Sequence, residues 1–181
     1  MINFKSCLHL NYPQKISSAK TSLKQISRCF SAKNGYPFPQ GSVICDYGGG
    51  AYDLNIEEMA RRGCVLLVID PFNRSKQYNE SNLEWLSLNP PNYVTCNNVL
   101  NVIEEDDALM NCINNVACLA QRGTAIFTIH DGDRDGRSRE TPRGYQRHQP
   151  LAYYTDILKK CGVFNKVFTK NGMIICQLTH A

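Results

Sequence analysis

Short runs of apolar residues alternate along this chain with longer segments in which apolar residues recur every three or four positions. The short runs predict strands, and the wider spacing predicts amphipathic helices. The run over residues 64–69 is apolar throughout, which is typical of a parallel strand covered on both faces. The predicted strands span residues 43–47, 64–69, 93–96, 124–129, 163–169 and 173–178. The predicted helices span residues 16–32, 53–62, 79–88, 104–121 and 151–160.

The order of these elements predicts the fold class. Strands and helices alternate from residue 43 to residue 160, and two strands follow that are joined by Lys170-Asn171-Gly172, a strong hairpin signal. This order favours an α/β three-layer sandwich with a mostly parallel sheet and an antiparallel C-terminal strand. We expect one such domain over residues 42–181. Residues 1–41 are expected to form a basic N-terminal helix and an arm that Pro37 and Pro39 keep extended.

Composition narrows the class of protein. The longest apolar run, residues 64–69, is far shorter than the roughly 18 residues of a membrane span, and the first residues lack the layout of a signal peptide. We therefore expect a soluble, cytoplasmic protein without membrane contact. The nine cysteines include no Cys-x-x-Cys pair, which favours reduced thiols. The four histidines show no ligand spacing, so no metal site is predicted.

The net charge of +4 is unevenly distributed. Residues 1–40 contain six lysines and arginines and no acid, whereas the loop over residues 131–149 contains five arginines and four acids. A basic arm is suited to nucleic acid or another polyanion, but the same charges are equally suited to a solvated surface. Charge alone leaves both interpretations open.

The ends of the first two predicted strands carry the strongest candidate chemistry. The first strand runs into Gly48-Gly49-Gly50, and the second ends at Asp70. Ligands of such sheets bind at the carboxyl ends of the strands, and a carboxylate there can accept both ribose hydroxyls of an adenosine group. Asp53 stands where a dinucleotide fingerprint has its third glycine, which argues against a pyrophosphate. We therefore predict an adenosine ligand without phosphates, the alternative being glycines that serve only a tight turn.

With these residues in place, the chain resembles the class I S-adenosylmethionine-dependent methyltransferases. Asp46-Tyr47-Gly48-Gly49-Gly50 is similar to their first motif, although Tyr52 replaces its last glycine, and Asp70 is similar to their ribose-binding acid. Residues 95–103 and 121–127 and the terminal hairpin resemble later parts of that fold. The resemblance implies a Rossmann-like domain, S-adenosyl-L-methionine as cofactor and a set of cofactor-binding residues. These are Asp46, Gly48, Gly50, Asp70, Phe72 and Asn97.

A closer resemblance is to methyltransferase-like proteins of bacteria and phages, including those associated with DNA phosphorothioation clusters. It rests on Asp46-Tyr47-Gly48, on residues 99–103 and 141–147, and on the short path from Asp70 to Tyr93, which leaves little room for a full third strand and helix. If the protein is phage-encoded, its location is the host cytoplasm. Two alternatives to a methyltransferase stay open. One is a non-methylating protein that binds or degrades S-adenosylmethionine, and the other is a nicotinamide or nucleotide-sugar protein.

The acceptor of the methyl group is expected near the polar loop that follows the fifth strand of the family pattern. Candidate catalytic residues there are His130, Asp133 and Tyr145, of which the last two could remove a proton if the acceptor must lose one. The loop is equally compatible with a solvated lid of internal ion pairs. No Asp-Pro-Pro-Tyr motif follows the preceding strand. Nucleic acid, a small molecule and a protein all remain possible acceptors, and the oligomeric state is open.

Overall fold

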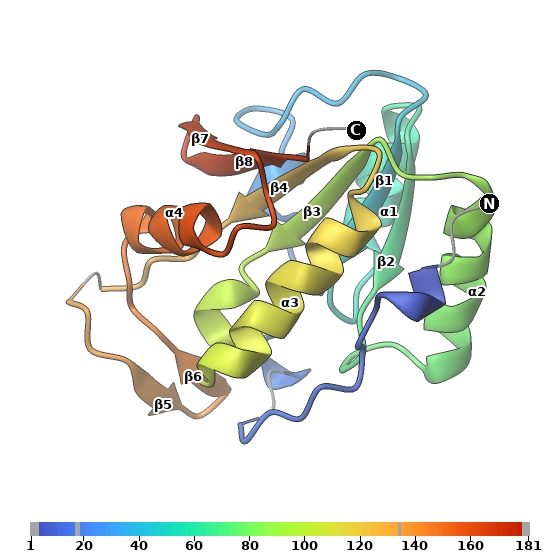
Figure 1. Ribbon diagram of the computed structural model, residues 1–181. Coiled ribbons are helices and arrows are strands. Elements are labelled where there is room, and N and C mark those ends of the chain that lie inside the picture. Colours follow the sequence, from blue (N-terminus) through green and yellow to red (C-terminus); the bar gives the residue numbers. More distant parts are fainter. Residues whose placement is uncertain (1–3, 17–18, 134, 179–181) are drawn as a thin grey trace.

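The computed structural model describes residues 4–16, 19–133 and 135–178. Six strands form one sheet in the order β2-β1-β3-β4-β8-β7 (Figure 1). Strands β1 to β4 are parallel, and β8 is antiparallel to both β4 and β7. The strands are β1 (Val43–Tyr47), β2 (Val65–Ile69), β3 (Tyr93–Asn97), β4 (Thr124–Thr128), β7 (Lys166–Lys170) and β8 (Met173–Gln177). The predicted fold class, including the terminal hairpin, is confirmed.

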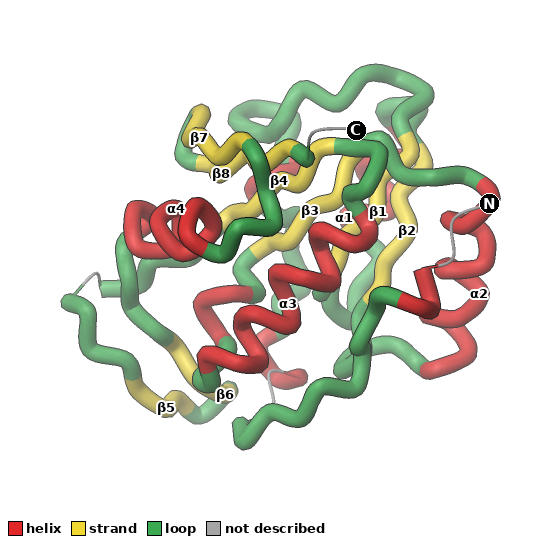
Figure 2. The backbone as a smooth tube through the Cα atoms, in the orientation of Figure 1, coloured by secondary structure: helices red, strands yellow, loops and turns green. Residues whose placement is uncertain are grey.

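Four α-helices flank the sheet: α1 (Leu54–Arg61), α2 (Lys76–Leu88), α3 (Asp106–Leu119) and α4 (Leu151–Lys160). Helices α3 and α4 cover one face and α1 covers the other, while α2 lies beside the edge strand β2 (Figures 1 and 2). Helix α2 begins where the Ser75 hydroxyl accepts a hydrogen bond from the Tyr78 amide, a standard N-cap. Acids in the first turn of α3 suit its dipole. All four helices were predicted, with shifts of a few residues at their ends.

The helix predicted over residues 16–32 is wrong. Residues 17 and 18 lie outside the described part, and the rest of the range contains only two 3₁₀-helices, η2 (Ala19–Thr21) and η3 (Arg28–Phe30). Two serines of the range bond to distant segments instead of supporting a helix. The Ser22 hydroxyl accepts from the Ala51 amide, and the Ser27 amide donates to the Asn55 side chain.

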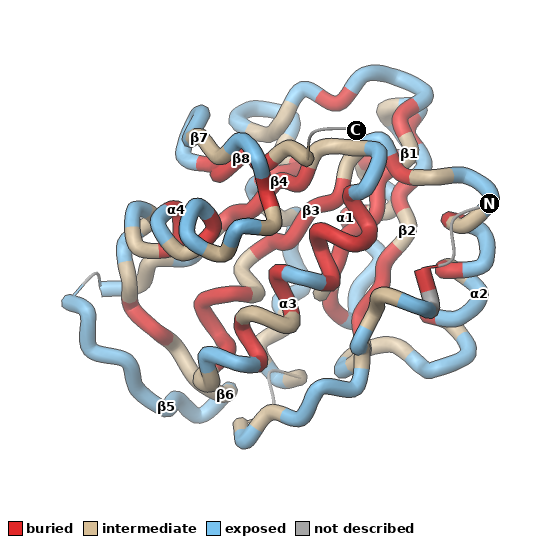
Figure 3. The backbone as a smooth tube through the Cα atoms, in the orientation of Figure 1, coloured by how far each residue is buried: buried red, intermediate tan, exposed pale blue. Residues whose placement is uncertain are grey.

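The N-terminal segment instead wraps around the domain. It begins at η1 (Phe4–Ser6), which packs against α2, and reaches strand β6 (Gly144–Gln146) at η2. We call the described residues 7–16 and 19–27 the N-terminal strap. It is mostly irregular and exposed (Figures 2 and 3). Beyond it, Phe30 and Phe38 join Met59 of α1 in the apolar cluster on one face of the sheet, so this part of the arm replaces a covering helix.

The expectation of reduced thiols is corrected at two positions. Cys7 and Cys118 form a disulfide that ties the start of the strap to the end of α3, and the other seven cysteines are free. The two partners lie 111 residues apart in sequence, so no spacing pattern indicates the pair. The same junction holds the strap by a hydrogen bond from the His9 amide to the Asn115 side chain.

The polar loop after β4 contains a small hairpin that the sequence did not predict. Strands β5 (Arg139–Thr141) and β6 (Gly144–Gln146) pair antiparallel, and the hairpin projects away from the sheet with β5 exposed (Figure 3). Arg147, which is buried, anchors it through bonds to the Ile103 and Glu104 carbonyls and the Asp106 carboxylate. None of the helices in the described residues has the length and apolarity that a membrane span requires.

Candidate functional site

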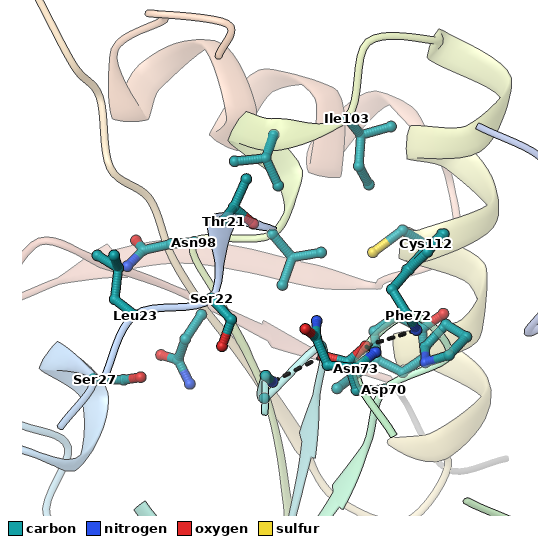
Figure 4. A pocket seen from close by; sticks show the side chains of 18 of the residues that line it. Thr21, Ser22, Leu23, Ser27, Asp70, Phe72, Asn73, Asn98, Ile103 and Cys112 are labelled. Atoms are coloured by element: carbon teal, nitrogen blue, oxygen red, sulfur yellow. Dashed lines mark hydrogen bonds between the residues drawn. The ribbon is translucent and has the colours of Figure 1, made fainter. Parts of the chain in front are cut away.

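A pocket opens at the carboxyl ends of β1, β2 and β3, where an α/β sheet is expected to bind its ligand. Its free volume is about 1040 Å³, a figure that includes space open to solvent. Its walls are the strap, the glycine turn (residues 48–50), the loop over residues 70–73, residues 97–99 and the first two turns of α3. Figure 4 shows the strap residues Thr21, Ser22 and Leu23 on one side and Asp70, Phe72 and Cys112 on the other.

Most of the predicted cofactor-binding residues meet in this pocket. Gly48, Gly50, Asp70, Phe72 and Asn97 all line it. Asp46, the sixth, is fully buried beneath the turn rather than on the wall. Segments from three strand ends therefore converge as the sequence predicted.

The glycine turn owes its shape to contacts within the protein. Gly48 and Gly50 have positive φ angles of 74° and 81°, a conformation in which glycine is favoured. A Cβ at Gly50 would lie 2.4 Å from the Ser22 hydroxyl, and one at Gly48 would lie 2.5 Å from the Val99 side chain. The missing side chains thus admit the strap on one side and the loop after β3 on the other.

Two backbone amides of the turn and the amide of the next residue, Ala51, already have partners in the protein. The Gly48 amide donates to the Ile69 carbonyl at 2.8 Å, and the Gly50 amide donates to Asp70 Oδ2 at 2.8 Å. The Ala51 amide donates to the Ser22 hydroxyl at 3.0 Å. Phosphate sites at such turns depend on free amides, so this turn is poorly suited to a phosphate.

Asp70 is buried, with 2% of its surface exposed, and its carboxylate accepts four hydrogen bonds. Oδ1 accepts from the amides of Phe72 and Asn73, both at 2.9 Å. Oδ2 accepts from the Gly50 amide at 2.8 Å and from Asn73 Nδ2 at 3.1 Å. The carboxylate thus joins the glycine turn to the loop after β2.

Asp46 is the centre of a buried polar network under the turn. Its Oδ1 accepts from the Thr95 hydroxyl at 2.7 Å and from Asn97 Nδ2 at 2.9 Å. Asn97 Oδ1 in turn accepts from the Thr128 hydroxyl at 2.9 Å, so the network crosses β1, β3 and β4. Asp46 Oδ2 is buried without a partner among the described residues. Burial raises the pKa of Asp46 to about 6, against the hydrogen bonds from Thr95 and Asn97, which lower it.

The pocket wall is polar but almost uncharged. Among the described residues that line it there is no lysine, arginine or histidine, and Asp70 is the only acid. Asparagine side chains supply much of its polarity. The asparagines on the wall are Asn55, Asn73, Asn97, Asn98 and Asn111. Such a wall suits a ligand that is neutral or positively charged.

The three candidate catalytic residues do not line this pocket. His130 is exposed, and its carbonyl accepts from the Gln146 side chain at 3.0 Å. Asp133 is exposed and ion-paired with Arg139. Tyr145 is half-buried on β6, which packs against η2 and against η4 (Leu100–Val102). Of the three, Tyr145 is thus on an element that borders the pocket wall.

The basic N-terminal arm and the arginine-rich loop over residues 131–149 meet, because η2 of the arm contacts β6 of the loop. The charges of the hairpin are partly cancelled, however, because Arg139 pairs with both Asp133 and Asp135. Lys15 of the strap lies 3.7 Å from Glu104. This local pairing matches the interpretation of the loop as a solvated surface with internal ion pairs.

Sequence reasoning missed the part of the pocket that comes from the strap and from α3. Ser22 and Leu23 lie more than 20 residues before the glycine turn, and Asn111 and Cys112 lie on a helix assigned to the core. One signal was present in the sequence: Asn111 and Asn115 interrupt the apolar pattern of α3. Their side chains donate to the His9 carbonyl at 2.9 and 3.2 Å and so hold the strap.

No family model and no curated protein matches the sequence. Several solved structures match the fold. The 1,6-didemethyltoxoflavin-N1-methyltransferase of Burkholderia thailandensis, solved with its acceptor and S-adenosylhomocysteine, gives a TM-score of 0.53 at 12% identity, covering 76% of this chain and 70% of that chain.

Two further solved structures are also similar to this chain in fold. A Rhodobacter sphaeroides protein described as a Zn-dependent alcohol dehydrogenase gives a TM-score of 0.50 at 11% identity, covering 78% and 84% of the two chains. A TehB-like S-adenosylmethionine-dependent methyltransferase of Corynebacterium glutamicum gives 0.43 at 15% identity, covering 77% and 80%. At TM-scores of 0.50 and above, the first two likenesses establish the Rossmann-like fold.

Proposed function

We propose that this protein is an S-adenosylmethionine-dependent methyltransferase whose cofactor binds in the pocket at the ends of β1, β2 and β3. The observation that carries the proposal is the convergence of the glycine turn, Asp70, Phe72 and Asn97 on one nearly uncharged pocket. The fold neighbour from Burkholderia thailandensis, which holds S-adenosylhomocysteine, supports it.

The competing ligand class is a nicotinamide dinucleotide, which one fold neighbour raises. A dinucleotide needs free amides or cations for its pyrophosphate. Here the amides of Gly48, Gly50 and Ala51 have protein partners, and no basic side chain is among the described lining residues. S-adenosylmethionine has no phosphate and carries a sulfonium cation, so it fits this wall better.

When bound, S-adenosylmethionine supplies a methyl group that is transferred by in-line displacement. The task of the protein is then to hold donor and acceptor close and aligned. Phe72 is suited to cover the adenine, and Asn97 is suited to face the methionine part. Asp46 holds Asn97 in place by accepting a hydrogen bond from its side chain. His130, Asp133 and Tyr145 can serve the acceptor only if it extends past the pocket towards β6.

The wall chemistry favours a small, uncharged acceptor over nucleic acid. A nucleic acid would need cations for its phosphates, and no basic side chain is among the described residues that line the pocket. A non-methylating protein that binds or consumes the cofactor is the second candidate, because none of the three candidate catalytic side chains lines the pocket.

The proposal is tested by calorimetry with S-adenosylhomocysteine and with NAD⁺. We expect the first to bind and the second to show no heat. Binding of NAD⁺ alone would contradict the proposal. Incubation with labelled S-adenosylmethionine and cell extract then separates the two candidates: label in an acceptor indicates a methyltransferase, whereas consumption without a labelled acceptor indicates the alternative.

A matched pair of variants ties binding to this pocket. Gly50→Ala places a methyl 2.4 Å from the Ser22 hydroxyl, whereas Gly41→Ala meets nothing within 4 Å. Their φ angles, 81° and 84°, impose similar backbone strain. We expect Gly50→Ala to weaken the binding of S-adenosylhomocysteine by about tenfold or more, the equivalent of one or two lost hydrogen bonds. Gly41→Ala should bind like the wild type.

A further inference from the structure

The Asp70 carboxylate has no capacity left for a ligand. An ionised carboxylate offers about four acceptor positions, and four donors of the protein occupy them: the amides of Gly50, Phe72 and Asn73 and the side chain of Asn73. A ribose hydroxyl could reach this carboxylate only by displacing one of these donors.

The three backbone donors are fixed by the fold. Phe72 and Asn73 lie two and three residues after Asp70, and their bonds form the turn by which an aspartate caps its own loop. Gly50 is held on two sides, because its amide donates to Asp70 and its carbonyl accepts from Arg74 Nε at 2.8 Å. Arg74 is itself paired with Asp53 at 2.6 Å. Displacing any of these amides would undo the turn that shapes the pocket.

Asn73 differs from the other donors. Its side chain is half-buried, lines the pocket and lies beside Asp70 (Figure 4). One hydrogen of its amide is used on Asp70 Oδ2, at 3.1 Å, and an asparagine amide has a second hydrogen and a carbonyl oxygen. That combination of donor and acceptor matches a hydroxyl group, which both donates and accepts.

We propose that Asn73 is the residue that binds the ribose hydroxyls, and that Asp70 is a positioning residue that holds the glycine turn in shape. The inference rests on the proposed function, since it assigns roles within the same cofactor pocket. Specificity for a nucleoside with intact hydroxyls then depends on the Asn73 amide. Asp70 contributes equally to every ligand of the pocket, because it acts through the shape of the turn.

The test compares two ligands on each variant, by competition against S-adenosylhomocysteine. The probes are adenosine and 2′,3′-dideoxyadenosine, which differ only in the two hydroxyls. We expect wild-type protein to prefer adenosine by roughly tenfold, the value of two ordinary hydrogen bonds. Asn73→Ala should bring this preference close to one and leave the affinity for dideoxyadenosine unchanged.

Asp70→Asn should weaken the binding of both probes by the same factor and lower the melting temperature of the free protein. The preference for adenosine over dideoxyadenosine should be retained. The matched control is Asn82→Ala, which removes an amide that bonds the Val68 carbonyl and is not among the residues lining the pocket. It should retain the full preference. If Asp70→Asn does not fold, Asn73→Ala alone decides the question.

Retention of the adenosine preference by Asn73→Ala overturns this inference and leaves the proposed function standing. The inference is also overturned if Asp70→Asn loses the preference while Asn73→Ala keeps it. Asp70 would then be the residue that binds the ribose hydroxyls. If the wild-type protein binds neither S-adenosylhomocysteine nor adenosine, the proposed function itself fails and this inference fails with it.

Discussion

The strand ends below the pocket, its floor, and the N-terminal strap above it, its roof, are held in place by different interactions. The floor is the carboxyl edge of the buried sheet: Ile44 and Asp46 within β1 are fully buried, and Asp70 after β2 is nearly so. The roof is the strap, in which Leu23 is 48% exposed and Ile26 is 41% exposed. Close packing therefore fixes the floor, whereas a disulfide, a few polar contacts and the partly buried Leu8 and Leu10 hold the roof. A pocket of this kind has a rigid shape below and a cover that can be altered without unfolding the domain.

The largest expected difference is between two isoleucines. Ile44→Ala in β1 should destabilise the protein by about 2–5 kcal/mol, because it removes a fully buried side chain from a packed core. Ile26→Ala in the strap is the matched change at an exposed position, and it should cost less than about 0.5 kcal/mol. Urea unfolding of both variants measures the two values. Equal losses would show that the strap is packed as firmly as the sheet.

The disulfide is the strongest single tie of the roof. Removing the Cys7–Cys118 bond should cost about 2–4 kcal/mol. Cys7→Ser, Cys118→Ser and the double variant should unfold at the same urea concentration. Treatment with dithiothreitol should bring the wild-type protein to that value and leave the variants unchanged. A wild-type protein that does not respond to the reductant would contradict this assignment.

The contrast between floor and roof also explains how much of the molecule the sequence predicts. Strands β1 to β4 and all four α-helices were expected, because apolar periodicity reports burial against the sheet. Five of six predicted cofactor-binding residues line the pocket, because consecutive parallel strands bring their carboxyl ends to one edge. Asp46, predicted to contact the cofactor or to order the glycine turn, is fully buried and bonds to Thr95 and Asn97.

The roof could not be predicted by the same argument. The apolar residues of 16–32 have helical spacing, yet Leu23 and Ile26 are exposed and only Cys29 and Phe30 are buried at its end. What holds this segment is a set of bonds to residues far away in sequence, such as Ser22 to Ala51 and Ser27 to Asn55. Periodicity contains no information about such pairings. The hairpin of β5 and β6 was missed because it is short and exposed.

The floor should also make stability depend on pH. Burial raises the pKa of Asp46 from 3.8 to about 6, so the folded state holds this proton more tightly than the unfolded state does. The resulting contribution is fully present below pH 3.8 and is lost as the pH rises to about 6; it amounts to at most roughly 3 kcal/mol. Above that range the cost of the buried charge is constant.

Asp46→Asn isolates this contribution from those of the other carboxylates. The quantity to follow is the unfolding free energy of the wild-type protein minus that of Asp46→Asn, from pH 4 to pH 7.5. We expect it to fall over this range, because only the wild-type protein loses a proton at position 46. A difference that stays constant with pH would mean that Asp46 is ionised throughout.

The smallest expected effect belongs to the bond between the strap and the glycine turn. Ser22→Ala removes the acceptor of the Ala51 amide, and because water can replace it at this exposed position, the loss of stability should be about 0.5–1.5 kcal/mol at most. Ser87→Ala is the matched control, since that hydroxyl donates within α2 to the Leu83 carbonyl. Hydrogen exchange measures the effect locally, at the Ala51 amide. The Ala51 amide should exchange up to roughly tenfold faster in Ser22→Ala and at the wild-type rate in Ser87→Ala. Unchanged exchange in Ser22→Ala would mean that the strap does not rest on the glycine turn.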